Sequence, residues 1–257
     1  MYLIIGGDST IGLALSNYWT ENNIPFHAST RNQELVSVQR PVIDLLNKST
    51  FKEISGYKSA VICAAVTDMA TCEEKPDETR AVNVTGTIKL IKKLEEKENH
   101  IVFLSTNQVF DGDKPMKEPN APRNPVNEYG RQKAEVEKFI ENITNTCILR
   151  LSKVIHNRLD LLNSWKILLA DGKPIFAFMD MTLSPINMND VIKKLDLIVR
   201  KKAEGIYQLS AGNDISYYEF AQEFAKKYGY SSELVKKDSW KDKLQFMPPM
   251  FTSLKNI

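Results

Sequence analysis

The chain opens with the stretch Tyr2-Leu3-Ile4-Ile5-Gly6-Gly7-Asp8-Ser9-Thr10-Ile11-Gly12. A short apolar run leads into a glycine-rich turn, and a helical pattern follows near residues 10–22. A strand, a glycine turn and a helix in this order can hold the pyrophosphate of a dinucleotide, because the free N–H groups at the helix start point at the anion. The stretch therefore predicts an α/β fold with a dinucleotide site at its first turn.

The spacing of Gly6 and Gly12 fits the GxxGxxG form of that turn, but Ser9 stands where the middle glycine is expected. A side chain there narrows the approach of the backbone to a phosphate, although its hydroxyl can donate a hydrogen bond to one. A plain strand-to-helix turn without a ligand is the alternative at this point. A hydrolase nucleophile elbow is disfavoured, because Ile11 occupies the place of its closing glycine.

Short apolar runs alternate with longer amphipathic stretches in the first part of the chain, which is typical of a parallel sheet with helical crossovers. We expect strands near residues 2–6, 25–30, 41–44, 59–65, 100–105 and 146–151. We expect helices near residues 10–22, 76–97 and 127–143. Right-handed crossovers place such helices on both faces of the sheet. The predicted fold class is a Rossmann-type, doubly wound parallel α/β sheet over residues 1–152.

The regular alternation of predicted strands and helices changes after about residue 152. We expect further helices near residues 158–171, 188–202 and 216–228, and short strands near 174–177 and 205–209. Residues 229–257 contain no long periodic segment. We therefore expect residues 153–257 to form a smaller substrate-binding lobe at the carboxyl edge of the sheet, interleaved with it and without a clear linker.

The composition disfavours several other classes of protein. The 257 residues include 34 Lys and Arg against 32 Asp and Glu, without like-charge blocks, so neither a nucleic-acid nor a membrane surface is expected. Three cysteines without CxxC spacing and three scattered histidines favour neither a disulfide framework nor a metal site. The first strand leaves no room for a signal peptide, and no apolar run approaches the roughly 18 residues of a membrane span, so a cytoplasmic protein is expected.

The end of the second predicted strand bears on which dinucleotide binds. A NAD site usually places Asp or Glu there to accept the ribose 2′-hydroxyl. This chain instead has Ser29-Thr30-Arg31, whose hydroxyls and guanidinium match a 2′-phosphate. NADP(H) is therefore favoured and NAD(H) stays open, with an ordinary surface arginine as the competing interpretation.

Tyr129 and Lys133 stand four residues apart at the start of a helical pattern, so both side chains can meet one ligand. A phenol has a pKa of about 10, and a nearby ammonium is expected to lower that pKa toward the working range. Ser105-Thr106 closes an apolar strand at its carboxyl end, where open α/β sheets bind ligands. A hydroxyl, a phenol and an ammonium behind a glycine turn indicate a catalytic set for carbonyl chemistry.

In combination these motifs resemble the dTDP-4-dehydrorhamnose reductase family, within the extended short-chain dehydrogenases that act on nucleotide sugars. The family's Ser-Thr-Asp-Tyr-Val-Phe-Asp-Gly is similar to Ser105-Thr106-Asn107-Gln108-Val109-Phe110-Asp111-Gly112. Its Asn-Pro and Tyr-Gly-x-x-Lys are matched by Asn124-Pro125 and Tyr129-Gly130-Arg131-Gln132-Lys133. Its Asn-Ala-Ala-Tyr-Thr and Ala-Val-Asn-x-x-Gly-Thr are similar to Cys63-Ala64-Ala65-Val66-Thr67 and Ala81-Val82-Asn83-Val84-Thr85-Gly86-Thr87. The resemblance extends to the tail around Pro248 and Thr252-Ser253-Leu254 and so covers nearly the whole chain.

The resemblance implies reduction of a keto group on a nucleotide-activated sugar, with the hydride supplied by NADPH. In this reaction Tyr129 would donate the proton, Lys133 would hold the nicotinamide ribose, and Thr106 would polarise the carbonyl. The residues implied to contact the cofactor are Gly6, Ser9, Thr10, Ile11, Gly12, Thr30, Arg31, Asp44, Leu45, Ala64, Ala65, Val66, Asn83, Tyr129 and Lys133. Those expected to contact the substrate are Thr67, Asn107, Val109 and Phe110. Asn107-Gln108 and Val154-Ile155-His156 depart from the family pattern, which leaves the particular sugar open.

Two other functions remain open at the level of the sequence. A nucleotide-sugar epimerase or dehydratase would keep NAD⁺ bound through its cycle. A branch of the same family serves as a non-catalytic regulatory subunit of methionine adenosyltransferase, which binds NADP without turning it over. A nucleotide sugar is the expected small-molecule partner, and a homodimer is compatible with a sequence that does not fix the oligomeric state.

Overall fold

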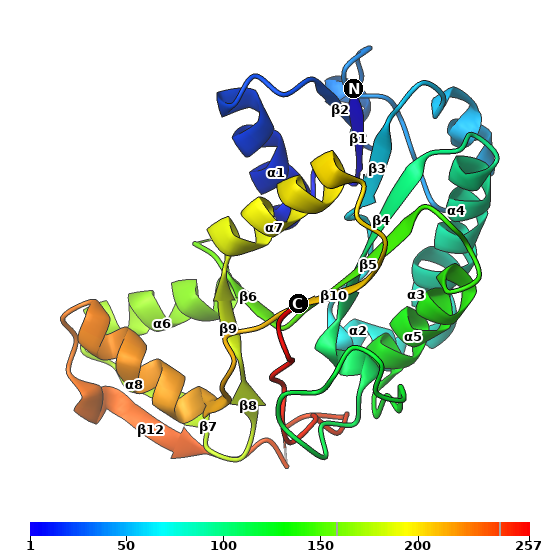
Figure 1. Cartoon of the computed structure of the whole chain (residues 1–257). Coiled ribbons are helices and arrows are strands. Elements are labelled where there is room, and N and C mark those ends of the chain that lie inside the picture. The colour runs from blue at the N-terminus through cyan, green and yellow to red at the C-terminus, as the bar shows by residue number, and fades with distance from the viewer. Residues whose placement is uncertain (158, 242) are drawn as a thin grey trace.

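The computed structural model describes residues 1–157, 159–241 and 243–257. Within them, a six-stranded parallel sheet runs in the order β10-β5-β4-β3-β1-β2 (Figure 1). Its strands are β1 Tyr2–Ile5, β2 Phe26–Ala28, β3 Ser59–Ile62, β4 His100–Thr106, β5 Thr146–Leu151 and β10 Gly205–Leu209. The chain leaves β1 for β2 on one side and crosses to β3 on the other, and ligands bind at such a reversal in open α/β sheets. The predicted doubly wound parallel fold is confirmed.

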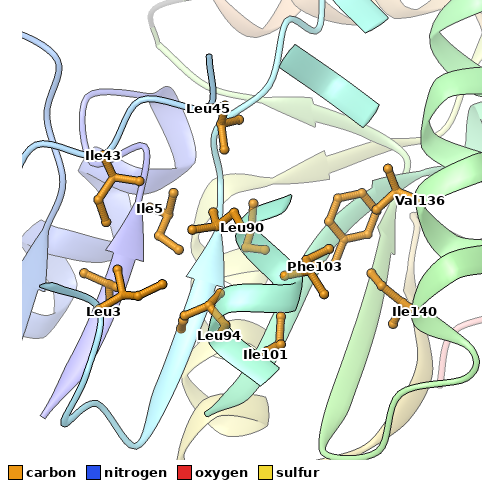
Figure 2. Packing of buried hydrophobic residues seen from close by; sticks show 14 of the residues in the cluster. Leu3, Ile5, Ile43, Leu45, Leu90, Leu94, Ile101, Phe103, Val136 and Ile140 are labelled. Carbon is orange, nitrogen blue, oxygen red and sulfur yellow. The ribbon is translucent and has the colours of Figure 1, made fainter. Parts of the chain in front are cut away.

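Helices cover both faces of this sheet, because successive residues of each strand point to opposite sides (Figure 1). On one face lie α1 Thr10–Glu21 and α7 Met188–Lys201, packed on the side of Ile4. The other face carries α4 Thr87–Glu95 and α5 Glu128–Ile140. Figure 2 shows the apolar core on that second face, which includes Leu3, Ile5, Ile43, Leu45, Leu90, Leu94, Ile101, Phe103, Val136 and Ile140.

The strand that we expected at residues 41–44 is wrong. Val42 forms only a single parallel bridge with Thr30, and Asp44 bridges back to Asn47. Pro41 has no N–H to give to a ladder, and the Asp44 side chain accepts from the N–H of Leu46 at 3.1 Å, which bends the chain. Local hydrogen bonding therefore competes successfully with strand pairing at this edge.

The long helix expected near residues 76–97 is divided in three. Helix α3 Pro76–Arg80 leads into a π-helical turn, η3 Ala81–Gly86, and then into α4. Further short elements in this half are α2 Met69–Glu74, η1 Gln33–Leu35, η2 Lys48–Glu53 and η4 Asn107–Val109. A π-helical turn often accompanies a functional site, and this one carries Asn83 inward.

The later part of the chain has an apolar core of its own. It is built by α6 Asp160–Ala170, β7 Ile175–Phe178, α8 Tyr217–Lys227 and β12 Val235–Asp238. Two pairs of short strands lie between this core and the sheet. Strand β6 Lys153–Ile155 pairs with β9 Pro185–Asn187, and β8 Thr182–Leu183 pairs with β11 Ile215–Ser216. A 3-10 turn, η5 Ser232–Leu234, precedes β12. Strand β10 and helix α7 belong to the main sheet and its helical layer, although they follow residue 152 in the chain. Two domains divided at residue 152 stay a prediction, and in such a division the later segment contributes elements to both domains.

Residues 248–257, called the C-terminal tail here, run back toward the sheet (Figure 1). Leu254 forms a parallel bridge with Lys117. The Asp214 carboxylate accepts hydrogen bonds from the N–H groups and the hydroxyls of Thr252 and Ser253. In the part of the chain described, no helix combines the length and the apolar character that a membrane crossing needs.

Candidate active site

The glycine turn is built by close backbone packing. Gly6 has a φ of +83°, and a Cβ there would lie 2.7 Å from the backbone nitrogen of Ala64. A Cβ on Gly12 would lie 2.3 Å from the carbonyl oxygen of Gly6. Ser9 caps α1, with its Oγ accepting from the N–H of Gly12 at 3.1 Å. The cap uses the Ser9 oxygen as an acceptor, so its O–H is still able to donate to an anion.

A cavity of about 440 Å³ opens beside this turn, and we call it the turn cavity. It is lined by Gly6, Asp8, Ser9, Ser29, Thr30, Arg31, Asn32, Ile43, Asp44, Leu45, Ala64, Ala65, Val66 and Val82. Most of the residues that the sequence assigned to the cofactor are therefore brought to one hollow. Its position, between the carboxyl ends of β1, β2 and β3 and the start of α1, suits an elongated anionic ligand.

Six residues assigned to the cofactor lie elsewhere, and two of them, Tyr129 and Lys133, line the second cavity described below. Gly12 packs into the turn itself, and Thr10 lines a separate hollow along α1. Ile11 faces the second cavity described below. Asn83 is buried, accepting from the N–H of Val66 and donating to its carbonyl, each at 2.8 Å. Asn83 therefore fixes the backbone that lines the turn cavity and does not line it.

Sequence reasoning missed Asp8, which lines the turn cavity. Its carboxylate accepts from the Thr30 hydroxyl at 2.6 Å and pairs with the Arg40 guanidinium. Arg40 therefore offsets the charge that Asp8 brings to the rim where Thr30 and Arg31 lie. An acidic residue inside a glycine turn is a signal that the sequence already contained.

A second cavity of about 300 Å³ lies beyond the carboxyl ends of β4 and β5, and we call it the strand-end cavity. The later lobe and the C-terminal tail contribute one side of it, through Met181, Thr182, Leu183, Tyr217, Pro249 and Thr252. The sheet side brings together the predicted Thr67, Thr106, Asn107, Tyr129 and Lys133. Ala65 lines both cavities, so the two adjoin at that residue.

Tyr129 is held by the start of α5. Asn127 caps this helix, accepting at its Oδ1 from the N–H of Gly130 at 2.8 Å. The same side chain donates to Oε1 of Gln108 at 2.7 Å, which ties the helix start to the segment after β4. The cap therefore places Tyr129, in the first turn of α5, beside the strand that ends in Thr106.

Lys133 is buried one turn further along α5. Its Nζ donates to the carbonyl of Leu104 at 2.9 Å and lies 5.9 Å from the centroid of the Tyr129 ring. Burial lowers the pKa of Lys133 to about 8. Burial also raises the pKa of Tyr129 above its ordinary value, which is the opposite of the shift expected from the sequence. Desolvation of the phenolate is the larger cause of the raised pKa of Tyr129, and the neighbouring Cys72 raises it further.

The two hydroxyls that end β4 have different partners. Thr106 Oγ1 accepts from the N–H of Gln108 at 3.2 Å and lies 3.3 Å from Asn107 Oδ1, to which it donates. Ser105 Oγ is buried, and it has no hydrogen-bond partner among the residues that the structure describes. Both residues line the strand-end cavity. A buried hydroxyl without a partner is costly unless a ligand satisfies it, so Ser105 joins Thr106 as a candidate to bind a carbonyl oxygen.

The comparison with known protein families gives one decisive match, since the model of the RmlD substrate binding domain aligns with residues 1–244. The chain belongs to the RmlD substrate binding domain family.

Curated relatives of this RmlD-family chain differ in what their names describe. This chain is 28% identical over 182 residues to the probable low-salt glycan biosynthesis reductase Agl14 of Haloferax volcanii, and the match covers 67% of this chain and 60% of that protein. It is 24% identical over 246 residues to the beta subunit of methionine adenosyltransferase 2 of Bos taurus, covering 90% of this chain and 72% of that one. The chain thus spans less than two thirds of the length of the Agl14 reductase.

Among solved structures, the RmlD-family fold recurs in dTDP-4-dehydrorhamnose reductase from Bacillus anthracis, determined in complex with NADP. The TM-score is 0.89 at 19% identity, and the match covers 100% of this chain and 90% of that one. The likeness establishes the extended α/β fold for the whole chain.

Two of the predicted substrate residues do not reach either cavity of the RmlD-family chain. Val109 and Phe110 are buried in a small apolar cluster with Leu254 of the C-terminal tail. The Arg150 guanidinium lies 4.9 Å from the centroid of the Phe110 ring. Their assignment to the substrate came from their position after Asn107, but the 3-10 turn at Asn107–Val109 directs the following residues into the core.

Several residues of the strand-end cavity were missed. Cys63 and Ser152 line it at strand ends, and Lys153 lines it directly after β5, whereas His156, which also lines it, belongs to the segment already noted as departing from the family pattern. A signal was available for Lys153, since a lysine directly after the apolar strand Thr146–Leu151 falls at the carboxyl edge where ligands bind.

Proposed function

We propose that the chain is an NADP(H)-dependent reductase of a keto group on a nucleotide-activated sugar, similar to dTDP-4-dehydrorhamnose reductase. The observation that carries the proposal is the junction of the two cavities at Ala65. One cavity has the glycine turn that suits a dinucleotide, and the other has Tyr129 and Lys133. A reactive ring bound across Ala65 would therefore meet a proton donor.

The residues present fit a dinucleotide at the turn cavity. The N–H groups at the start of α1 and the Ser9 hydroxyl can donate to a pyrophosphate. Arg31 can donate to a 2′-phosphate at the rim, where Thr30 donates to Asp8 and Arg40 pairs with the same carboxylate. The similar fold of the Bacillus anthracis reductase, crystallised with NADP, supports this preference.

NADPH, when bound, supplies the hydride. Tyr129 donates its phenolic proton to the oxygen of the substrate carbonyl, and its raised pKa keeps that proton in place at neutral pH. Ser105 hydrogen-bonds the same oxygen, as does Thr106 once its hydroxyl turns away from Asn107 Oδ1, and both favour the charge that develops on that oxygen. Lys133, charged below its pKa of about 8, holds ribose hydroxyls and stabilises the phenolate left after transfer.

The direct test incubates the chain with NADPH or NADH and a panel of nucleotide-linked 4-keto sugars, following the loss of dinucleotide absorbance. We expect oxidation of NADPH with at least one of these sugars, and slower oxidation of NADH. No oxidation with any sugar on the panel, by a chain that binds NADPH, would contradict the proposal.

A regulatory subunit is the second candidate, because the similarity to the methionine adenosyltransferase beta subunit covers 90% of this chain. A regulatory subunit would copurify with a partner protein and would bind NADPH without oxidising it.

A cytoplasmic location and a homodimer are further predictions. Cell fractionation would test the location, and light scattering would test the oligomeric state.

A further inference from the structure

Lys153 lines the strand-end cavity, yet among the described residues no partner holds its ammonium. In the described residues the side chain makes no hydrogen bond, ion pair or ring contact, whereas Lys133 in the same cavity donates to Leu104. Burial lowers the pKa of Lys153 below its ordinary value. A partly desolvated ammonium without a partner is costly, and an anionic ligand would offset that cost.

The lining of this cavity leaves the ammonium without a counter-charge. Lys133, Lys153 and His156 all line it, and neither Asp nor Glu is among the described residues that do so. The remaining lining is apolar or carries neutral hydroxyl, amide and thiol groups. The cavity therefore attracts a negative group, and Lys133 already has a carbonyl partner and a place beside Tyr129.

The register of the sheet tells which end of a substrate Lys153 meets. Thr106 of β4 pairs with Leu151 of β5, and Lys153 follows two residues later. Strand spacing places the Cα atoms of Thr106 and Lys153 about 8 Å apart, within reach of a four-carbon stem. Since Thr106 and Tyr129 flank the reacting carbonyl in the proposed function, Lys153 lies at the sugar and not at the distant nucleotide.

We propose that Lys153 is a specificity-determining residue that binds an anionic substituent, such as a carboxylate, on the sugar of the substrate. The chain would then select acidic nucleotide sugars over their neutral counterparts. This inference rests on the proposed function, because it takes the reacting sugar to lie between Tyr129 and Thr106.

The experiment measures binding of matched ligands that lack a keto group, so that no turnover intervenes. The full chain, saturated with NADPH, is titrated by calorimetry with UDP-glucuronate and UDP-glucose, with GDP-mannuronate and GDP-mannose, and with UDP and GDP alone. The two sugars of each pair differ only in a carboxylate. We expect the acidic member of at least one pair to bind about 10- to 100-fold more tightly, as a charge-assisted hydrogen bond provides.

Three variants assign that preference. Lys153→Met keeps the apolar stem and is expected to bind both members of the pair equally, while Lys153→Arg retains the preference. Lys166→Met, at an exposed position on α6, is the matched control and leaves the preference unchanged. A purely structural role of Lys153 would weaken both members together and could not change their ratio.

The proposal is overturned by a wild type that fails to prefer the acidic member of any pair, or by a preference that survives in Lys153→Met. It is also overturned if Lys153→Met weakens the acidic sugar, the neutral sugar and the free nucleotide equally, since Lys153 would then bind the diphosphate. Failure of the proposed function is separate: reduction of neutral keto sugars without an acidic preference removes only this inference. An acidic preference without turnover of any keto sugar removes only the reductase.

Discussion

Tyr129 and Lys133 have pKa shifts of opposite sign that come first from the same cause. Burial disfavours the charged form of each group, so the pKa of Tyr129 is raised and the pKa of Lys133 is lowered to about 8. The neutral phenol suits a proton donor to a carbonyl. The sequence predicted the reverse shift for the tyrosine, because spacing shows that the ammonium is near and does not show that the phenol is desolvated.

Removal of the phenolic hydroxyl separates binding from chemistry. We expect Tyr129→Phe to keep its affinity for NADPH and to lose turnover by about 100-fold or more, since general acid catalysis contributes that much. Fluorescence titration of NADPH and steady-state kinetics measure the two effects. Tyr230→Phe, in the core of the later lobe, serves as the control. Unchanged turnover in Tyr129→Phe would remove the phenol from the mechanism.

Lys133 gives a pH dependence of stability whose sign follows from linkage. The unfolded chain keeps the lysine proton up to a pKa of 10.5, whereas the folded chain releases it near pH 8. Between these values the unfolded state binds more protons, so the free energy of unfolding of the wild type rises with pH. Relative to Lys133→Met, we expect a rise of up to about 3 kcal/mol over that window in urea denaturation. Parallel curves for the two proteins would contradict the lowered pKa.

The two hydroxyls of β4 should differ on substitution. Ser105→Ala removes a group without a protein partner, so we expect turnover to fall about 10- to 100-fold at unchanged stability. Thr106→Val also removes the acceptor for the N–H of Gln108, so it should lower both turnover and the melting temperature. Steady-state kinetics and thermal unfolding of both variants measure these two effects and show whether the roles of Ser105 and Thr106 differ. A Ser105→Ala enzyme of full activity would leave Thr106 alone as the carbonyl donor.

At the scale of elements, the C-terminal tail depends on one carboxylate. Asp214 accepts from the N–H groups and hydroxyls of Thr252 and Ser253, and Thr252 and Pro249 line the strand-end cavity. None of the described residues that line the turn cavity belongs to the tail. In the proposed function, the tail is therefore placed to affect the keto sugar without affecting the dinucleotide.

Asp214→Asn replaces acceptor oxygens by an amide that cannot accept all of these hydrogen bonds. We expect the free energy of unfolding to fall by about 1–3 kcal/mol and the KM for a keto sugar to rise, with the Kd of NADPH unchanged. Asp171→Asn is the control, because among the described residues that carboxylate forms an ion pair only with exposed Lys173. An equal loss of NADPH affinity would show that the tail also supports the turn cavity.

At the scale of the whole molecule, one buried guanidinium connects segments far apart in the chain. Arg150 of β5 donates to the buried Glu137 of α5 at 2.6 Å, to the carbonyl of Pro119 at 2.8 Å and to Gln208 of β10 at 3.2 Å. Both ionic partners are almost fully buried, at 1% and 0% exposure, so solvent screens their interaction little. This network joins α5 to the edge of the sheet that the later part of the chain completes.

Arg150→Met leaves the Glu137 carboxylate buried without that partner. We expect a loss of about 3–5 kcal/mol of unfolding free energy in urea denaturation. Arg80→Met breaks the exposed pair with Glu135 and should cost less than about 1 kcal/mol. The double variant Arg150→Met/Glu137→Leu should recover much of the loss. A single variant as stable as the wild type would show that the pair does not hold α5 to the sheet.

The sequence by itself determined what local periodicity and short spacings encode. The glycine turn before α1, the alternation of strands with helices, and the pairing of Tyr129 with Lys133 on one helix face all follow from neighbours in the chain. They were predictable because backbone conformation and side-chain direction repeat with a fixed period.

Only the tertiary structure decided which strands pair in the sheet and which side chains from distant parts of the chain come into contact. It removed the strand at residues 41–44, returned β10 to the main sheet and buried Phe110 in the core. It also desolvated Tyr129 and placed Lys153, without a partner among the described residues, in a cavity between the sheet and the later lobe. These outcomes depend on contacts between residues tens of positions apart in the chain. Such contacts determine how deeply each side chain is buried, and a local sequence pattern does not predict that burial.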